Sequence, residues 1–252
     1  MIIVNDVSLN RGTRTVIHNV SLEVPAGQCV ALVGPNGSGK STLLGGITGD
    51  LDVANGSIQI DEVPIADLDN LELAKLRAVM TQQVSVSFGF AVREVVQMGR
   101  SPWRGTDASN DDDEIVNQCL AAMDIVHLAD RPVQALSGGE LARVAMARVL
   151  AQSTPILILD EPTAALDLRH QQELLECVKR HTADGGAALI VLHDLSLTAA
   201  YADSVGVLSE GNLVAFGSPQ EVLVPEVLDA VYETEVITMT HPRTGRPIII
   251  PA

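Results

Sequence analysis

Residues 34–41 read GPNGSGKS, and the residues on either side indicate which structure this stretch forms. The apolar run Val30–Val33 precedes it, and a helical pattern begins at Lys40. A strand, a glycine-rich loop and a helix in this order are the context of a phosphate-binding loop. Glycines let the backbone curl so that successive N–H groups point at phosphate oxygens, and the helix N-terminus adds partial positive charge. The predicted nucleotide-binding residues are Gly34, Pro35, Asn36, Gly37, Ser38, Gly39, Lys40, Ser41 and Thr42.

Two side chains of this loop carry specific chemistry. Lys40 would place a full positive charge on the β and γ phosphates, and the Ser41 hydroxyl is a predicted Mg²⁺ ligand. The alternative is a glycine-rich turn with a surface lysine. The strand before the loop and the helix after it disfavour that alternative.

Three short runs rich in Val, Ile and Leu have the character of strands buried on both faces, as in parallel sheets. These runs span residues 28–33, 155–159 and 187–192. Helical patterns separate them, at residues 40–48, 139–151 and 169–181. Strands that alternate with helices predict an α/β layer fold.

The other segments have different patterns. Up to about Asp61, short alternating runs at 2–9, 15–24 and 56–60 predict an antiparallel β layer. From about residue 83 to 150 the pattern is helical, interrupted by a loop at 101–113. Several prolines between residues 236 and 252 predict an extended tail over the surface of the core.

Two acidic residues and a histidine follow the apolar runs. Asp160 and Glu161 come directly after one run, at the strand end where open α/β sheets bind ligands. Asp160 is a predicted Mg²⁺ ligand, and Glu161 would polarise an attacking water. His193 ends the next run and would reach the same edge, where it could hydrogen-bond a γ phosphate. A lone histidine is more often structural, but this position favours the functional interpretation.

The stretch Leu136–Glu140 reads LSGGE and opens a helix. Ser137 is a plausible N-cap, and the two glycines expose backbone N–H groups, so this is a second potential anion-binding helix terminus. A simple helix cap explains the stretch equally well.

Composition excludes several classes of protein. The 252 residues include 16 Lys+Arg and 32 Asp+Glu, for a net charge of −16. This charge would repel nucleic acid or an anionic membrane, and one Trp, two Tyr and three Phe provide few stacking surfaces. No apolar stretch approaches the ~18 residues of a spanning helix, and the N-terminal segment lacks the basic residues of a signal peptide. We therefore expect a soluble protein that serves a membrane only through a partner.

The order GPNGSGKST, Gln82, LSGGE, ILILDEP, AALD and His193 strongly resembles the ATP-binding cassette (ABC) ATPases over nearly the whole chain. The resemblance implies an α/β P-loop nucleotide hydrolase core with an antiparallel β layer and an inserted helical subdomain. It implies a single domain over 1–252, with the catalytic core at 1–82 and 151–235, the helical signature subdomain at 83–150 and a C-terminal extension at 236–252.

The resemblance also assigns roles. It implies ATP and Mg²⁺, and a head-to-tail homodimer in which the signature of one copy caps the ATP held by the other. The signature residues in trans would be Ser137, Gly138, Gly139 and Glu140. Gln82 would sense Mg²⁺ beside the membrane partner, and Asp167 would lie in the loop that bridges the two sites. Glu161 would be the catalytic base, and His193 would be the γ-phosphate switch. Arg11 stands where the family usually stacks an aromatic ring on adenine, and an arginine plane can also stack on a base.

Shorter stretches point to a branch of the family. Residues 87–92 and 98–103 resemble importers of iron chelates, haem and cobalamin, while residues 166–171, 191–197 and 241–247 are most similar to the haem-importer ATPases. The resemblance implies two copies of this chain with two membrane permease subunits, peripheral on the cytoplasmic face and connected only indirectly to a substrate-binding protein. The alternatives are a ferric-siderophore or cobalamin importer and, more remotely, a non-transport ABC ATPase or a P-loop phosphotransferase.

Overall fold

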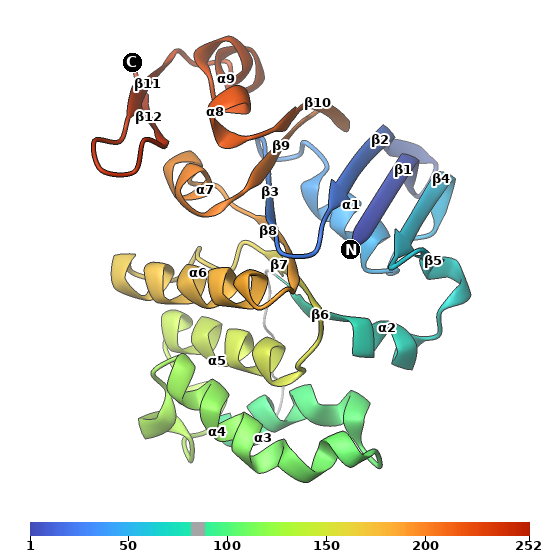
Figure 1. The fold of residues 1–252 in the computed structure, drawn as a ribbon, viewed down its shortest axis with the longest axis vertical. Helices are drawn as coiled ribbons and strands as arrows, with labels where there is room; N and C mark the ends of the chain where they lie inside the picture. Colours follow the sequence, from blue (N-terminus) through green and yellow to red (C-terminus); the bar gives the residue numbers. More distant parts are fainter. Residues whose placement is uncertain (82–88) are drawn as a thin grey trace.

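The computed structural model describes residues 1–81 and 89–252, and a six-stranded sheet forms its centre (Figure 1). The strand order is β10-β9-β3-β8-β7-β6, with neighbours parallel except for the antiparallel pair of β9 and β10. The strands are β3 (Cys29–Val33), β6 (Arg77–Met80), β7 (Ile156–Asp160), β8 (Ala187–Val191), β9 (Ser204–Ser209) and β10 (Asn212–Gly217). The three buried strands and the α/β fold predicted from the sequence are confirmed.

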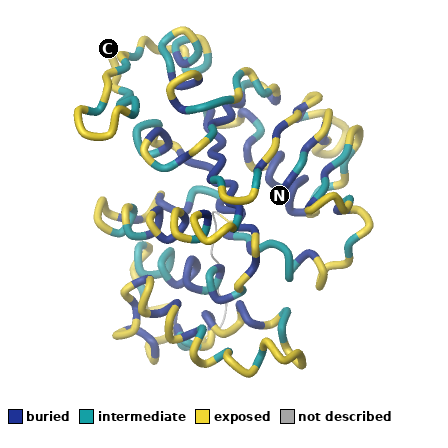
Figure 2. Tube along the Cα trace, in the orientation of Figure 1, coloured by how far each residue is buried: buried dark blue, intermediate teal, exposed yellow. Residues whose placement is uncertain are grey.

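Alternate side chains of the central strands enter two separate cores. In β3, Val30 and Leu32 belong to one cluster of buried side chains, whereas Ala31 and Val33 belong to the other. Because both faces of the strand are covered, the sequence is continuously apolar rather than alternating. The centre of the molecule is accordingly buried in Figure 2.

A second, antiparallel sheet covers one face of the central sheet. Its order is β2-β1-β4-β5, which agrees with the predicted antiparallel layer. Its strands are β1 (Ile2–Arg11), β2 (Arg14–Val24), β4 (Val53–Ile60) and β5 (Val63–Pro64). Helix α1 (Lys40–Ile47) packs into the same core through Leu43, Leu44 and Ile47. The helix that carries the phosphate loop is therefore fixed between the two sheets.

Helices cover the other face of the central sheet and extend beyond it (Figure 1). They are α3 (Val92–Gln97), α4 (Asp112–Ala122), α5 (Gly138–Ala151), α6 (Leu168–Ala183), α7 (Leu195–Tyr201), α8 (Pro219–Val222) and α9 (Pro225–Tyr232). Helix α2 (Asn70–Leu76) instead packs through Leu73 into the core shared with the antiparallel sheet. Short 3₁₀ helices join them: η1 (Ile65–Asp67), η2 (Met98–Trp103), η3 (Asp107–Asp111), η4 (Val126–Leu128) and η5 (Val133–Ala135). The helical middle of the chain was predicted correctly. The predicted loop at 101–113, however, contains η3 and the start of α4.

The C-terminal segment differs from its prediction. Instead of an extended tail, residues 236–251 form an antiparallel hairpin of β11 (Val236–Thr240) and β12 (Pro247–Pro251). The prolines stand at the ends of β12 or in the turn, so they bracket the hairpin without interrupting its pairing. Gly245 adopts a left-handed conformation (φ 70°) within the turn. Proline content was therefore a poor guide to this segment.

None of the helices in the described part of the chain has the length and hydropathy that crossing a membrane would require.

Candidate active site

The loop after β3 has a backbone that only glycine permits at two points. Gly34 and Gly39 have φ values of 146° and 106°. A Cβ atom on Gly34 would lie 2.1 Å from the carbonyl oxygen of Leu208, and one on Gly39 would lie 2.6 Å from the side chain of Ile17. These glycines keep the loop curled against the central sheet and the antiparallel layer, so its backbone faces the space beyond β3.

Lys40 is buried within this loop. Its Nζ atom donates to the carbonyl oxygens of Gly34 at 2.7 Å and of Pro35 at 3.0 Å. Burial lowers the pKa of Lys40, and the negative charges of Glu161 and Asp160 act in the opposite direction. The lysine thus lies at the centre of the loop, within electrostatic range of both predicted acidic residues.

Ser41 and Asp160 come together from different elements, the start of α1 and the end of β7. The Ser41 side chain hydrogen-bonds Asp160. The other carboxylate oxygen, Oδ1, is buried and has no hydrogen-bond partner among the described residues. Burial, with the nearby charge of Glu161, raises the pKa of Asp160. A hydroxyl beside an unsatisfied carboxylate oxygen suits Mg²⁺, which prefers hard oxygen ligands. Gln82, the third predicted ligand, lies outside the described residues.

Glu161 and His193 form a close pair. Nε2 of His193 lies 2.6 Å from Oε1 of Glu161, and the histidine is far more exposed than the glutamate, at 47% against 13%. Glu161 has a left-handed backbone (φ 50°), and its N–H donates to the carbonyl oxygen of Val191 on β8. Non-glycine residues in this conformation carry strain and cluster at functional sites. The two predicted catalytic residues are therefore adjacent at one sheet edge.

Lys40, Ser41, Glu161 and His193 line one cleft of about 520 Å³, while Asp160 lies in the wall of an adjoining hollow that also contains Glu161. The lining residues of the cleft are Arg11, Val16, Asn36, Gly37, Gly39, Lys40, Ser41, Thr42, Glu161 and His193. Gly34, Pro35 and Ser38 belong to the loop but are not among the lining residues. Val16 was not predicted, because no motif marks it and only the β1–β2 pairing brings it to the cleft. Arg11 is exposed at the end of β1 and lines the cleft.

The LSGGE stretch forms the start of α5. Ser137 is the N-cap, and its backbone N–H and hydroxyl both donate to Oε2 of Glu140, at 2.7 Å and 2.8 Å. These hydrogen bonds lower the pKa of Glu140. The Glu140 carboxylate is thus engaged in the cap, whereas Ser137 and Gly138 are exposed. A Cβ on Gly139 would lie 3.1 Å from the carbonyl oxygen of Ala165, which leaves little space for a side chain there.

Within the described chain, the cleft lining includes no residue of α5. Gly138 instead lines a smaller hollow of about 110 Å³ together with Asp160 and Glu161. The phosphate loop and the LSGGE cap therefore line different hollows in a single copy of this chain. Asp167 follows both in sequence, as the exposed N-cap of α6, and its carboxylate accepts hydrogen bonds from the backbone N–H and Nδ1 of His170. These two bonds lower the pKa of Asp167.

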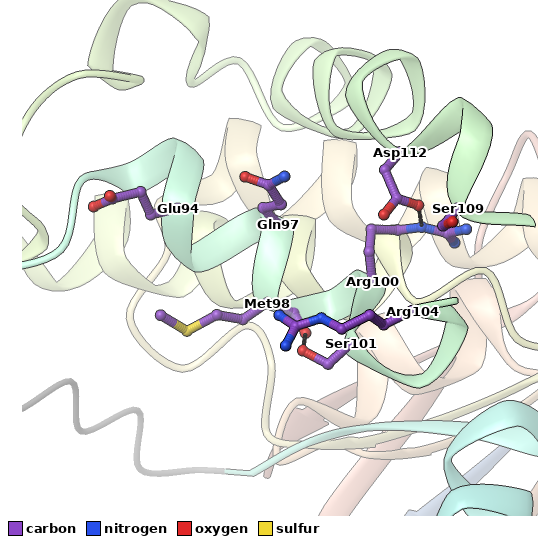
Figure 3. A pocket seen from close by; sticks show the side chains of 8 residues that line it. All are labelled: Glu94, Gln97, Met98, Arg100, Ser101, Arg104, Ser109 and Asp112. Atoms are coloured by element: carbon purple, nitrogen blue, oxygen red, sulfur yellow. Dashed lines mark hydrogen bonds and ion pairs between the residues drawn. The ribbon is translucent and has the colours of Figure 1, made fainter. Parts of the chain in front are cut away.

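A second hollow, of about 260 Å³, lies on the helical side of the molecule (Figure 3). It is lined by Glu94, Gln97, Met98, Arg100, Ser101, Arg104, Ser109 and Asp112. Arg100 is almost fully buried and fixes its wall, because it pairs with Asp112 at 2.7 Å and donates to the carbonyl oxygens of Ala151 and Ala108. The hollow combines charged residues with the exposed thioether of Met98.

Known proteins are similar to this chain in sequence and in fold. A family model described as "ABC transporter" matches residues 17–164. A protein of Thermobifida fusca named "Hemin import ATP-binding protein HmuV" is 49% identical over 97% of this chain and 86% of its own length. A protein of the same name from Pseudomonas aeruginosa is 43% identical over 99% of both chains. The dimeric structure of a bacterial ABC transporter cassette has a TM-score of 0.79 and 28% identity, covering 87% of this chain and 99% of that one.

Proposed function

Because this chain belongs to the ABC transporter family, as an ATP-hydrolysing subunit, we propose that it drives the import of haem through a separate membrane permease. The single observation that carries the choice of haem is the similarity to relatives named for hemin import, which extends over nearly the whole of this chain. The cleft supplies the chemistry that such a subunit needs, since it gathers a phosphate loop, the carboxylate of Glu161 and a histidine, with Asp160 hydrogen-bonded to Ser41 beside it.

ATP would bind with its phosphates in the loop between β3 and α1. Lys40 would exchange the carbonyl oxygens of Gly34 and Pro35 for phosphate oxygens, and the loop N–H groups would surround the phosphates. Ser41 and Asp160 would hold Mg²⁺, which when bound neutralises charge on the β and γ phosphates. Arg11 would lie against the adenine, with Val16 beside it.

Glu161 would act as the base that orients and polarises the attacking water. Its carboxylate is paired with His193, so the γ phosphate would compete for the histidine and release the glutamate toward water. The same two side chains would then have separate tasks: His193 contacts the γ phosphate and Glu161 contacts the water. This exchange would make hydrolysis depend on a correctly placed γ phosphate.

The complete site would require two copies of the chain in a head-to-tail homodimer. The exposed cap formed by Ser137, Gly138 and Gly139 would meet the γ phosphate held by the other copy, since it does not meet the cleft of its own. A helix N-terminus is suited to an anion. Glu140 would hold the cap in shape rather than contact ATP, and Asp167 would lie in the seam between the two sites.

The membrane partner would dock on the helical side. The hollow of Figure 3 offers charged side chains and the exposed Met98 to a partner. Its wall, fixed by the Arg100–Asp112 pair, would pass the motion of the dimer to the permease. Gln82 would sense Mg²⁺ beside the membrane partner. Two permease subunits would bind the dimer at the cytoplasmic face of the membrane, and a substrate-binding protein would be connected only through them.

A deletion strain tests this proposal. Growth would be scored with haem, a ferric siderophore or cobalamin as the limiting nutrient, and restored with the wild-type chain or with a Lys40→Ala variant as the inactive control. We expect loss of growth on haem alone, and rescue by the wild-type chain only. Loss of growth on a siderophore or cobalamin instead would reassign the substrate, and normal growth on all three would remove the proposed import role.

A further inference from the structure

The C-terminal hairpin, β11 and β12, does not line the site described above, but it contacts α7, the helix that follows His193. Strand β8 ends at Val191, and α7 begins at Leu195. His193 therefore lies on a short connection, and its backbone position depends on how α7 is held. The hairpin packs beside α7 (Figure 1).

The first contact is at the start of α7. Oγ of Ser196 accepts a hydrogen bond from the N–H of Ile249 at 3.1 Å and donates to the carbonyl oxygen of the same residue at 3.2 Å. The N-cap residue Asp194 accepts from the N–H of Ser196. Strand β12 is thus joined through one serine to the turn that directly follows His193.

The second contact is at the opposite end of α7. Nη1 of Arg246 donates to the carbonyl oxygens of Ala199, Ala200 and Ala202, at 2.8 Å, 3.0 Å and 3.0 Å. The last carbonyl oxygens of a helix lack partners within it, and a cation there also complements the helix dipole. A helix of seven residues is too short to be stable by itself. The hairpin therefore supplies polar contacts at both ends of α7.

A third contact joins the same part of the chain to the phosphate loop. Tyr232, the last residue of α9, hydrogen-bonds the backbone of Gly34, and burial raises its pKa. Asp229 of α9 in turn accepts from the N–H of Val236 at the start of β11. The C-terminal segment thus contacts both the loop that carries Lys40 and the helix that follows His193.

We propose that the C-terminal hairpin positions His193 in the nucleotide site, with Arg246, Ser196 and Tyr232 as positioning residues. The proposal rests on the γ-phosphate role of His193 proposed above. Arg246 and Ser196 fix the two ends of α7, and Tyr232 fixes the loop against the same segment. Together they set the place of the histidine relative to the loop without touching ATP themselves.

A purely structural hairpin would behave differently. If it only stabilised the fold, its loss would lower the melting temperature, and the remaining folded molecules would hydrolyse ATP normally. A positioning hairpin instead lowers kcat in folded molecules, leaves ATP binding unchanged, and acts only while His193 is present.

The experiment uses Arg246→Met, which keeps the length of the side chain and removes its donors. Arg246→Lys is the conservative variant, because an ammonium can also donate to three carbonyl oxygens. Arg243→Met is the matched control, since Arg243 lies exposed in the same turn and its guanidinium forms no hydrogen bond or ion pair with residues 1–81 or 89–252. Each change is made in the wild-type chain and in His193→Ala, and ATPase kcat, KM for ATP and hydrogen exchange of α7 are measured on the full chain.

We expect Arg246→Met to lower kcat on the order of tenfold, as small misplacements of catalytic groups do. KM should change less than twofold, Arg246→Lys should recover most of the rate, and α7 amides should exchange faster only in Arg246→Met. In the His193→Ala background, Arg246→Met should have no further effect on kcat. If Arg246→Met does not fold, Ser196→Ala is tested in the same cycle.

Equal losses of kcat with and without His193, or an unchanged kcat in folded Arg246→Met whatever the exchange of α7, would overturn the proposal. The outcome is separable from the proposed function. A strain that grows normally on haem without this chain would refute the import role but leave the coupling of Arg246 to His193 intact. Additive losses of kcat would refute the positioning role alone.

Discussion

At the scale of single residues, Glu161 combines strain with function. Its left-handed backbone turns the chain sharply after β7, so that Asp160 remains beside Ser41 while Glu161 faces His193. Two adjacent carboxylates would otherwise point to opposite sides of the strand. The strained residue therefore allows neighbouring acidic residues to serve one cleft.

Glu161→Gln should keep ATP binding and abolish turnover. The amide keeps the shape of the side chain and can still hydrogen-bond His193, but it cannot act as a base. We expect a loss of kcat of ~10²-fold or more, unchanged ATP affinity by equilibrium binding, and an ATP-dependent dimer in sedimentation experiments. Glu62→Gln is the control, because Glu62 also has a left-handed backbone (φ 68°) and lies far from the motifs of the site. Turnover at the wild-type rate would remove Glu161 from the role of base.

Residues within motifs were predictable, whereas residues brought in by packing were not. The structure brings Lys40, Glu161 and His193 to one cleft, with Asp160 hydrogen-bonded to Ser41 beside it, because parallel strands deliver their following residues to one edge. Val16 reaches the cleft only through strand pairing, and the bonds of Lys40 to loop carbonyl oxygens depend on the folded loop.

At the scale of elements, the same N-terminal cap occurs twice. At α8, the backbone N–H and hydroxyl of Ser218 both donate to Oε2 of Glu221, as those of Ser137 do to Glu140 at α5. Only the α5 cap carries exposed glycine backbone beyond the serine. Two local structures with the same bonds therefore permit a comparison between stability and function.

Ser137→Ala and Ser218→Ala should each lower the free energy of unfolding by about 1 kcal/mol, the usual cost of losing an N-cap side chain. Only Ser137→Ala should also lower the ATPase rate, since only that hydroxyl would meet a nucleotide. Chemical denaturation and steady-state ATPase assays measure the two effects. Equal ATPase rates in the two variants would mean that the Ser137 hydroxyl is only a cap.

Elements without motifs were the ones that the sequence did not reveal. Strands β6, β9 and β10 were not predicted. Strand β6 has only four residues, β6 and β9 pair with strands distant in sequence, and β10 is an edge strand that pairs with β9. The hairpin of β11 and β12 was mistaken for an extended tail, because its prolines lie at strand ends where pairing tolerates them. Tertiary pairing determines these segments more than local composition does.

At the scale of the whole molecule, charge opposes self-association. Each chain has a net charge of −16, so a dimer would carry twice that, or −32. The proposed closed dimer must therefore overcome repulsion through contacts to ATP at the seam. Screening reduces such repulsion between exposed charges.

Closure should consequently tighten as salt increases. The Debye length falls from about 10 Å at 0.1 M to about 3 Å at 1 M salt. With Glu161→Gln at saturating ATP, the dimer Kd measured by analytical ultracentrifugation should decrease across this range. Saturating nucleotide is essential, because salt also weakens the attraction between Lys40 and phosphates. A Kd that rises with salt would indicate that attractive charge pairs dominate the seam.

The separation of the phosphate loop from the LSGGE cap within one copy has a consequence for heredity. In the proposed assembly, two patches that line different hollows of one molecule meet across copies, yet one gene encodes both. Any inherited change in either patch is therefore present at both nucleotide sites of the assembly at once.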